Sequence, residues 1–161
     1  VSAQNRKRLF WTNIPNVTAP ADRGILLKDI LENGDSDRLK SYCIDANYFK
    51  GGKIGGTHQS SKRNYTIRIG QIGKGGQGDR IYSQEGKSVG LSALGGGRGA
   101  KTGLYAVDNQ IRKLSPTECE RLQSLPDNYT EGVSNSQRYK MLGNAFNVDV
   151  VSHILSFIVK N

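Results

Sequence analysis

The chain opens with polar and basic residues and then becomes apolar without a break. Residues 8–14 are rich in β-branched and aromatic side chains, which predicts a strand whose members Leu9, Phe10, Trp11 and Ile14 belong to a core. In residues 24–34 leucine and isoleucine recur at helical spacing, and Gly34 can supply a left-handed C-cap, so we expect a short helix there.

Between residues 41 and 110 short strand-like runs alternate with glycine clusters. The runs are NYTIRIGQI, DRIYSQ, SVGLSAL and GLYAVD, and the clusters are KGGKIGG, GKGGQG and GGGRG. This spacing predicts β-hairpins with flexible, basic tips. The basic side chains at these tips are Lys50, Lys53, Lys62, Arg63, Lys74, Arg80, Lys87, Arg98 and Lys101. Each tip alone could be a solvated loop, but three clusters together favour a DNA-facing surface, since glycine permits close approach and Lys or Arg can reach phosphates.

Two helices are predicted near the C-terminus. The stretch RKLSPTECERLQSLP contains a capping box formed by Ser115 and Glu118, with Pro116 at the first helical position and Pro126 as the stop. In residues 143–161 apolar side chains recur at helical spacing, which predicts a terminal helix that packs along one side.

Composition and charge narrow the class of protein. The 161 residues are enough for one domain, and no apolar stretch has the length of a membrane span or a signal peptide, so a cytoplasmic protein is expected. The formal net charge of +9, from 23 Lys and Arg against 14 Asp and Glu, favours a polyanionic partner. A basic but otherwise ordinary soluble protein also fits the charge.

Cysteine and histidine do not indicate a metal site. Cys43, Cys119, His58 and His153 have no ligand spacing, and a structural zinc ion needs four such ligands, usually in close pairs. No metal is therefore expected. Both cysteines are interpreted as small buried residues, and neither has a neighbour that marks a nucleophile.

The stretch from Arg112 to Pro126 closely resembles the ninth conserved motif of the DNA (cytosine-5) methyltransferases. The matching residues are Arg112, Leu114, Ser115, Glu118, Arg121, Leu122, Gln123 and Pro126. Helix capping explains Ser115 and Glu118 but does not require Arg112, Arg121 or Gln123. The resemblance gives Arg112 and Glu118 a structural role between recognition domain and hinge, and leaves Arg121 open to either role.

Two further stretches resemble motifs of the same family. LGNAFNVDVV is similar to the tenth motif, in which Gly-Asn-(Ser/Ala) opens the last helix, and Gln4, Arg6 and Arg8 fit the Gln-x-Arg-x-Arg of the eighth. Taken alone, the eighth-motif residues could be a phosphate-binding or nuclear-localisation-like run, and Asn144 could be a helix cap. The three motifs stand in the family's order and cover nearly the whole chain, which favours the family interpretation.

The resemblance implies an α+β fold and a division of the chain into three parts. Residues 1–18 would belong to a Rossmann-like catalytic domain, residues 19–130 to a small, mostly β target-recognition domain, and residues 131–161 to a helix that returns to the catalytic domain. In this family the recognition domain reads the DNA sequence with loops, so the DNA-binding residues expected here are Lys74, Arg80, Arg98 and Lys101.

The resemblance also implies the chemistry. The family methylates carbon 5 of a cytosine flipped out of duplex DNA, with S-adenosylmethionine as donor and a cysteine thiolate that attacks carbon 6. Arg8 would contact the carbonyl of the flipped cytosine, Arg6 a flanking phosphate, and Gln4 would fix their geometry. Asn144 and Ala145 would lie near the amino-acid end of the cofactor, at a helix N-terminus, although many relatives have serine in place of Ala145.

Other family motifs are missing from this sequence. The Phe-x-Gly-x-Gly cofactor loop, the Pro-Cys-Gln with the nucleophilic cysteine and the Glu-Asn-Val are absent, and the chain begins on Val1. We therefore expect the C-terminal half of a Dcm-like bacterial or phage enzyme, inactive without an N-terminal half on the same chain or a separate subunit. A non-enzymatic, sequence-preferring DNA-binding module is the alternative, and a basic RNA-binding protein is weaker because no aromatic stacking motif is present.

Overall fold

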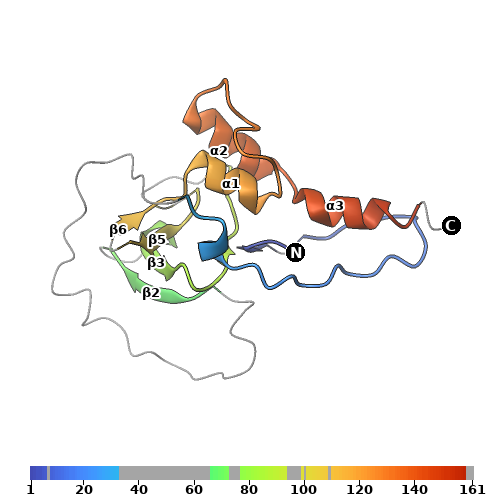
Figure 1. Ribbon diagram of the computed structural model, residues 1–161, viewed down its shortest axis with the longest axis horizontal. Helices are drawn as coiled ribbons and strands as arrows, with labels where there is room; N and C mark the ends of the chain where they lie inside the picture. Colours follow the sequence, from blue (N-terminus) through green and yellow to red (C-terminus); the bar gives the residue numbers. More distant parts are fainter. Residues whose placement is uncertain are drawn as a thin grey trace.

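A computed structural model of the chain describes residues 1–6, 8–32, 66–72, 77–93, 99, 101–108 and 110–158. The described part contains a four-stranded mixed sheet of order β2-β3-β5-β6, covered at one end by helices (Figure 1). The strands are β2 (Arg68–Gln71), β3 (Arg80–Ser83), β5 (Leu104–Val107) and β6 (Gln110–Arg112). A separate parallel pair joins β1 (Gln4–Asn5) to β4 (Ser88–Val89). The described fold is therefore α+β, as the sequence predicts.

The glycine cluster GKGGQG lies between two strands that pair as predicted. β2 and β3 are antiparallel neighbours, with Gln71 opposite Arg80, and the short 3-10 helix η2 (Gln77–Asp79) leads into β3. β3 then pairs in parallel with β5, which forms an antiparallel pair with β6. The run SVGLSAL contributes only the two residues of β4, and these pair with the N-terminal strand rather than with the sheet.

The buried core joins the sheet to the helices. Tyr105 on β5 is fully buried against Tyr82, at 6.0 Å between ring centroids, and its hydroxyl accepts a hydrogen bond of 2.9 Å from the Val89 N–H. Leu27, Leu122 and other apolar side chains extend this cluster to the helices. The core thus connects β4, and through it β1, to the rest of the molecule.

The predicted strand over residues 8–14 is wrong. β1 ends at Asn5, and residues 8–14 have no strand pairing. Leu9 and Trp11 are 80% and 87% exposed, so they are not core residues. The residue types in 8–14 favour extended backbone, but a strand also needs a neighbouring strand to pair with. β4 pairs only with the two residues of β1, Gln4 and Asn5.

The predicted helix over residues 24–34 is reduced to one turn of 3-10 helix, η1 (Leu27–Asp29). Its cap is unusual, because the Asp29 carboxylate accepts the Leu26 N–H at 2.8 Å. The Leu27 and Lys28 N–H groups donate to Gly86 and Gln84 carbonyls in the turn after β3. The turn after β3 therefore holds η1 in place. Residues 33 and 34, which include the expected C-cap, lie outside the described residues.

The first C-terminal helix is confirmed in detail. α1 (Pro116–Leu122) has Pro116 at its start; the Ser115 hydroxyl accepts the Glu118 N–H at 3.1 Å, and the Glu118 carboxylate accepts the Ser115 N–H at 2.7 Å. This is the reciprocal bonding of a capping box. The sequence did not predict the next helix, α2 (Asn135–Asn144), which is mostly polar and has Ser134 as its N-cap.

The last helix, α3 (Val148–Leu155), starts later than the motif predicts and packs differently. Its N-cap is Asn147, so Gly143 and Asn144 end α2 instead of opening α3. α3 has no buried residue, which contradicts the packing expected for an ordinary terminal helix. It extends away from the sheet beside the segment that follows β1 (Figure 1), and His153 Nε2 lies 2.9 Å from the Thr18 carbonyl oxygen. No helix in the described part of the chain could cross a membrane.

Candidate active-site cleft

A cleft of about 350 Å³ lies between the N-terminal segment and the start of α3. Residues 4, 6 and 8 alternate along the extended chain, which brings their side chains toward the same side. The lining includes Gln4, Arg6, Arg8 and Phe10 from the N-terminal segment, Asp22 and Lys87 from neighbouring segments, and Phe146, Asn147 and Val150 from the C-terminal part. The structure therefore brings the three eighth-motif residues together with residues of the stretch that resembles the tenth motif.

The cleft contains hydrogen-bond donors that the described residues leave without acceptors. Arg6 Nη2 donates to the Gly143 carbonyl at 2.8 Å, but Arg6 Nε and Nη1 and Gln4 Nε2 are buried and have no partner there. Burial lowers the pKa of Arg6, and the neighbouring Arg8 lowers it further. A buried donor without an acceptor costs about 1–3 kcal/mol. Such a set fits a ligand with several acceptor oxygens, such as a phosphate or a base carbonyl.

Gly143 permits close packing between the end of α2 and the segment that follows β4. A Cβ atom at this position would lie 2.4 Å from the backbone nitrogen of Ala93. Any side chain would therefore separate the end of α2 from the segment that follows β4. The glycine of the tenth motif is required here by close packing of backbone on backbone.

The two residues predicted for the cofactor do not line the cleft. Asn144 ends α2 with an exposed side chain, and Ala145 is the C-cap of that helix. Phe146, 57% exposed, and Asn147 line it instead. Sequence reasoning missed both because it placed the helix start at Gly143; the Asn-x-x-Val spacing after Phe146 was the available signal for an N-cap.

The polar groups at the start of α3 bond within the chain. Asn147 is fully committed, since its Nδ2 donates to Leu122 O and Ser124 Oγ while its Oδ1 accepts the Val150 N–H. The Val148 N–H donates to the Gln123 carbonyl. The helix N-terminus predicted to hold the carboxylate of the cofactor is thus already bonded within the chain, which leaves Asn144 as the exposed polar side chain nearby.

The predicted DNA-binding residues are only partly described. Lys74 and Arg98 lie outside the described residues, as do Lys50, Lys53, Lys62 and Arg63. Arg80 is half-buried at the start of β3, and Lys101 is half-buried in a turn. Neither lines the cleft. The placement of Lys87 at a loop tip is wrong, because this side chain is buried at 5% exposure.

The ninth-motif residues form a junction around α1. Arg112 makes two hydrogen bonds of 2.8 and 2.7 Å with the fully buried Glu118 carboxylate, which also accepts the Glu32 N–H. Arg121 pairs with Asp127 and donates to the Ile30 carbonyl at 2.9 Å. These bonds attach the segment around η1 to α1.

Two more polar side chains complete this junction. Gln123 is fully buried, and its Nε2 donates to the Leu142 carbonyl of α2 at 2.7 Å. Glu120, also fully buried, pairs with Arg138 of α2 at 2.8 Å and accepts the Thr130 N–H. Sequence reasoning assigned no role to Glu120 or Arg138, which give no motif signal because their contact depends on α2.

Cys119 is not a nucleophile. Its side chain is fully buried in α1, and burial, with Glu118 and Glu120 beside it, raises the pKa of the thiol well above its usual value. A thiolate is the reactive form of cysteine, so this environment suppresses reactivity. Cys43 lies outside the described residues.

The sequence matches the C-5 cytosine-specific DNA methylase family over residues 2–160. The chain belongs to this family. Members transfer a methyl group to DNA, with S-adenosylmethionine as the donor in general. This C-5 cytosine methylase chain is 51% identical over 89 residues to the type II methyltransferase M.HhaI of Haemophilus parahaemolyticus, covering 55% of this chain and 27% of that protein. It is 44% identical over 59 residues to the type II methyltransferase M.Sau3AI of Staphylococcus aureus, covering 37% of this chain and 14% of that protein.

Solved structures support the fold. The methylase chain superposes on Schizosaccharomyces pombe Dnmt2 methyltransferase with a TM-score of 0.51 at 19% identity, covering 84% of this chain and 42% of that structure. It superposes on the Entamoeba histolytica methyltransferase EhMeth with a TM-score of 0.55 at 14% identity, covering 92% of this chain and 45% of that structure. The chain thus matches less than half the length of these methyltransferases.

Proposed function

We propose that this chain supplies the DNA-recognition and active-site-completing part of a DNA (cytosine-5) methyltransferase of the bacterial or phage type. The observation that carries the proposal is the cleft, where Gln4, Arg6 and Arg8 stand together and buried nitrogens lack acceptors. Membership of the methylase family supplies the substrate class for such a site.

In the proposed reaction the cleft receives a cytosine flipped from duplex DNA. Flipping costs a few kcal/mol of unstacking, which contacts to the base and its phosphates must offset. The exposed Arg8 donates to the cytosine carbonyl and stabilises negative charge that develops on the ring. Arg6, held by Gly143 through Nη2, directs its other two nitrogens to a flanking phosphate, and Gln4 Nε2 fixes their arrangement.

The proposal requires a second part that carries the nucleophilic cysteine and most of the cofactor site. The motifs for both are absent from this sequence, and Cys119 is buried. Exposed aromatic side chains in both walls of the cleft support a covering partner: Phe10 is 46% and Phe146 57% exposed. Large exposed apolar side chains that cluster in this way are typical of an interaction surface. The partner is the N-terminal half, on the same polypeptide or on a separate subunit.

We further propose that Lys74, Arg80, Arg98 and Lys101 contact duplex DNA from the recognition domain, residues 19–130. The half-buried Arg80 supports this in part, because its Nε is buried without an acceptor among the described residues. Lysine and arginine contacts to phosphate weaken with salt, so each removed contact lowers the salt dependence of binding.

The test is transfer of labelled methyl from S-adenosylmethionine to duplex DNA. The chain is assayed alone and mixed with an N-terminal half from a related enzyme or from the upstream reading frame. Methyl transfer by the mixture alone, abolished by Arg8→Ala, supports the proposal. The matched control is Arg23→Ala, an exposed arginine that pairs with Asp149 outside the cleft and leaves transfer unchanged.

Two other outcomes contradict the proposal in different ways. Methyl transfer by the chain alone would contradict the proposal, because the proposal assigns the nucleophilic cysteine to a partner. Retained DNA binding with no transfer in any mixture favours the alternative, a sequence-preferring DNA-binding module without enzyme activity, which the net charge of +9 also accommodates.

A further inference from the structure

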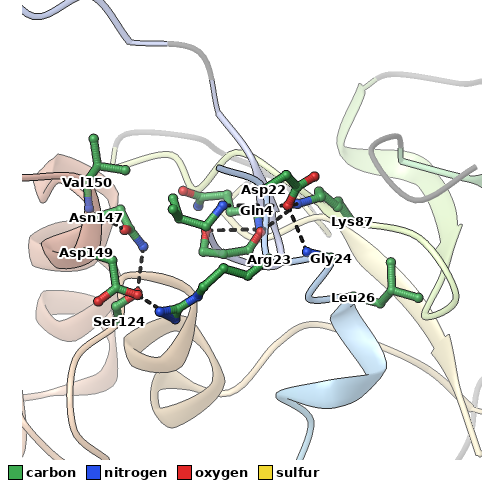
Figure 2. Close-up of polar contacts among 12 residues, drawn as sticks. Gln4, Asp22, Arg23, Gly24, Leu26, Lys87, Ser124, Asn147, Asp149 and Val150 are labelled. Atoms are coloured by element: carbon green, nitrogen blue, oxygen red, sulfur yellow. Dashed lines mark hydrogen bonds and ion pairs between the residues drawn. The ribbon is translucent and has the colours of Figure 1, made fainter. Parts of the chain in front are cut away.

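Lys87 is a buried lysine beside the eighth-motif strand. It is 5% exposed, and its Nζ donates to the Ser2 carbonyl at 2.9 Å and to Asp22 Oδ1 at 3.0 Å (Figure 2). A lysine is almost never buried unless its charge is paired. The position of this ammonium group is therefore set by the two oxygens that it binds.

The backbone next to Lys87 pairs with the same strand. The Ser88 N–H donates to the Ala3 carbonyl at 2.7 Å, and Gln4 lies opposite Ser88 in the short parallel pair of β1 and β4. A pair of two-residue strands is weak on its own. The Lys87 side chain adds a second attachment one residue before the pairing, at Ser2.

Asp22 brings a third segment to this point. It lies where the chain returns from the exposed residues 8–20 toward η1, and it also accepts the Gly24 N–H at 3.1 Å (Figure 2). That hydrogen bond lowers the pKa of Asp22, burial opposes the shift, and Lys87 lowers the pKa further. Asp22 is thus ionised at neutral pH, and Lys87 joins β1, β4 and the returning segment.

We propose that Lys87 is a positioning residue of the cleft. Through the Ser2 carbonyl and Asp22 it holds the N-terminal strand so that Gln4, Arg6 and Arg8 present their donors to the target base and its phosphates. This inference rests on the proposed function. It adds a residue outside the matched motifs, directly before β4, to the machinery that orients the proposed catalytic arginines.

A positioning role and a purely electrostatic role give opposite predictions for two variants. Lys87→Met removes one positive charge from the lining of the cleft, whereas Asp22→Asn removes one negative charge. If the charge of Lys87 served only to attract DNA, the two variants would change activity in opposite directions. If the Lys87–Asp22 pair holds the strand, both variants lower activity, and the double variant is no worse than the single ones.

The first measurement needs no activity. Hydrogen–deuterium exchange of the chain reports opening of residues 1–8, and Lys87→Met should raise exchange there about tenfold, the size expected for loss of the charge-assisted hydrogen bond to the Ser2 carbonyl. Lys28→Met is the matched control, because Lys28 also pairs with a carboxylate, Glu85, at 2.7 Å but is 45% exposed and does not line the cleft. It should leave exchange of residues 1–8 unchanged. Asp22→Asn serves if Lys87→Met fails to fold, since Asp22 is partly exposed.

The second measurement is kcat and KM of the complemented enzyme. Lys87→Met and Asp22→Asn should each lower kcat roughly 10–100-fold with little change in KM, because small misplacements of positioning groups have effects of this order. Opposite changes in the two variants, or unchanged exchange in both, would overturn the positioning role. If the wild-type mixture transfers no methyl group, the proposed function fails, while the exchange comparison still decides whether Lys87 holds the strand.

Discussion

The junction around α1 and the cleft are both built from motif residues, yet they treat polar side chains in opposite ways. In the junction Arg112 bonds to the Glu118 carboxylate, and Arg121 bonds to Asp127 and to the Ile30 carbonyl. These hydrogen bonds are 2.6–2.9 Å long. In the cleft Gln4 and Arg6 hold buried nitrogens without acceptors. The comparison separates two kinds of motif residue: one group holds the fold together, and the other keeps donors that bonds among the described residues do not use.

Unpartnered atoms also occur in the junction, but they are of another kind. Glu120 Oε2 and Gln123 Oε1 are oxygens of side chains that already bond through their other polar atom, and neither lines the cleft. The unpartnered atoms of the cleft residues Gln4 and Arg6 are buried nitrogens. Hydrogen-bond donors in a cleft favour a ligand with an anionic or carbonyl oxygen. The unpaired oxygens of Glu120 and Gln123 lie outside the cleft and do not indicate a ligand.

The largest effect on stability is expected from the junction. Arg112→Met leaves the Glu118 carboxylate buried without its bidentate partner, and breaking a buried pair in this way lowers the free energy of unfolding by about 3–5 kcal/mol. Urea denaturation measures the change. The neighbouring Lys113→Met, an exposed position, should have little effect. Equal stability of the two variants would show that the junction does not depend on this ion pair.

A smaller loss is expected where the two regions meet. Gly143→Ala forces a Cβ into the backbone of Ala93 and should lower the free energy of unfolding by about 1–3 kcal/mol, as overpacking does. Gly90→Ala is the control, because its Cβ would meet the Asn5 carbonyl oxygen at 3.6 Å, an ordinary contact. Thermal unfolding of both variants checks the expectation. A stable Gly143→Ala variant would mean that residues 92–93 can move aside.

The pH dependence of stability should reveal the buried carboxylate of the junction. Burial raises the pKa of Glu120, but hydrogen bonds from Thr130 and Arg138 outweigh it, so the pKa is lowered from the usual 4.5. The stabilisation is then complete above pH 4.5 and is lost as the pH falls through the lower folded value. Glu120→Gln should therefore destabilise at neutral pH, and the difference from wild type should narrow in acid.

The control for this titration is Glu131→Gln, which changes an exposed glutamate a few residues away. Urea midpoints of wild type and both variants from neutral pH to pH 3 give the comparison. A constant gap between wild type and Glu120→Gln over this range would mean that Glu120 does not titrate with unfolding.

The smallest effect on stability is expected in the cleft. Arg8 is exposed, so Arg8→Ala should change the free energy of unfolding by no more than about 0.5 kcal/mol, as surface substitutions do. The same variant should abolish methyl transfer by the complemented enzyme. Loss of stability comparable to that of Arg112→Met would remove the distinction between the two regions.

Local signals allowed much of the fold to be predicted. The capping box fixes the start of α1 because its residues bond to one another within four positions, and the β2–β3 hairpin follows from adjacent strand-like runs. The strand over residues 8–14 was wrong because a strand depends on a distant edge, which local composition does not contain. α2 was missed because its contacts with α1 run through polar groups such as Arg138 and Glu120.

The candidate site was predictable as far as motifs reached. Gln4, Arg6 and Arg8 were found because the eighth motif gives their spacing, and the structure brings them together. Lys87 was assigned to a loop tip because its glycine neighbour suggests a turn, and its burial depends on Ser2 and Asp22, which lie 85 and 65 positions away. Contacts of that range leave no periodic trace in a single sequence.

The hydrogen bond from Arg6 to the Gly143 carbonyl joins residues 137 positions apart. One wall of the cleft is therefore synthesised among the first residues of this segment and the other among the last. During translation Arg6 therefore lacks this acceptor until α2 has left the ribosome. Contacts of such long range form late and slowly. The order of synthesis thus delays completion of the cleft until α2 and the start of α3 are made.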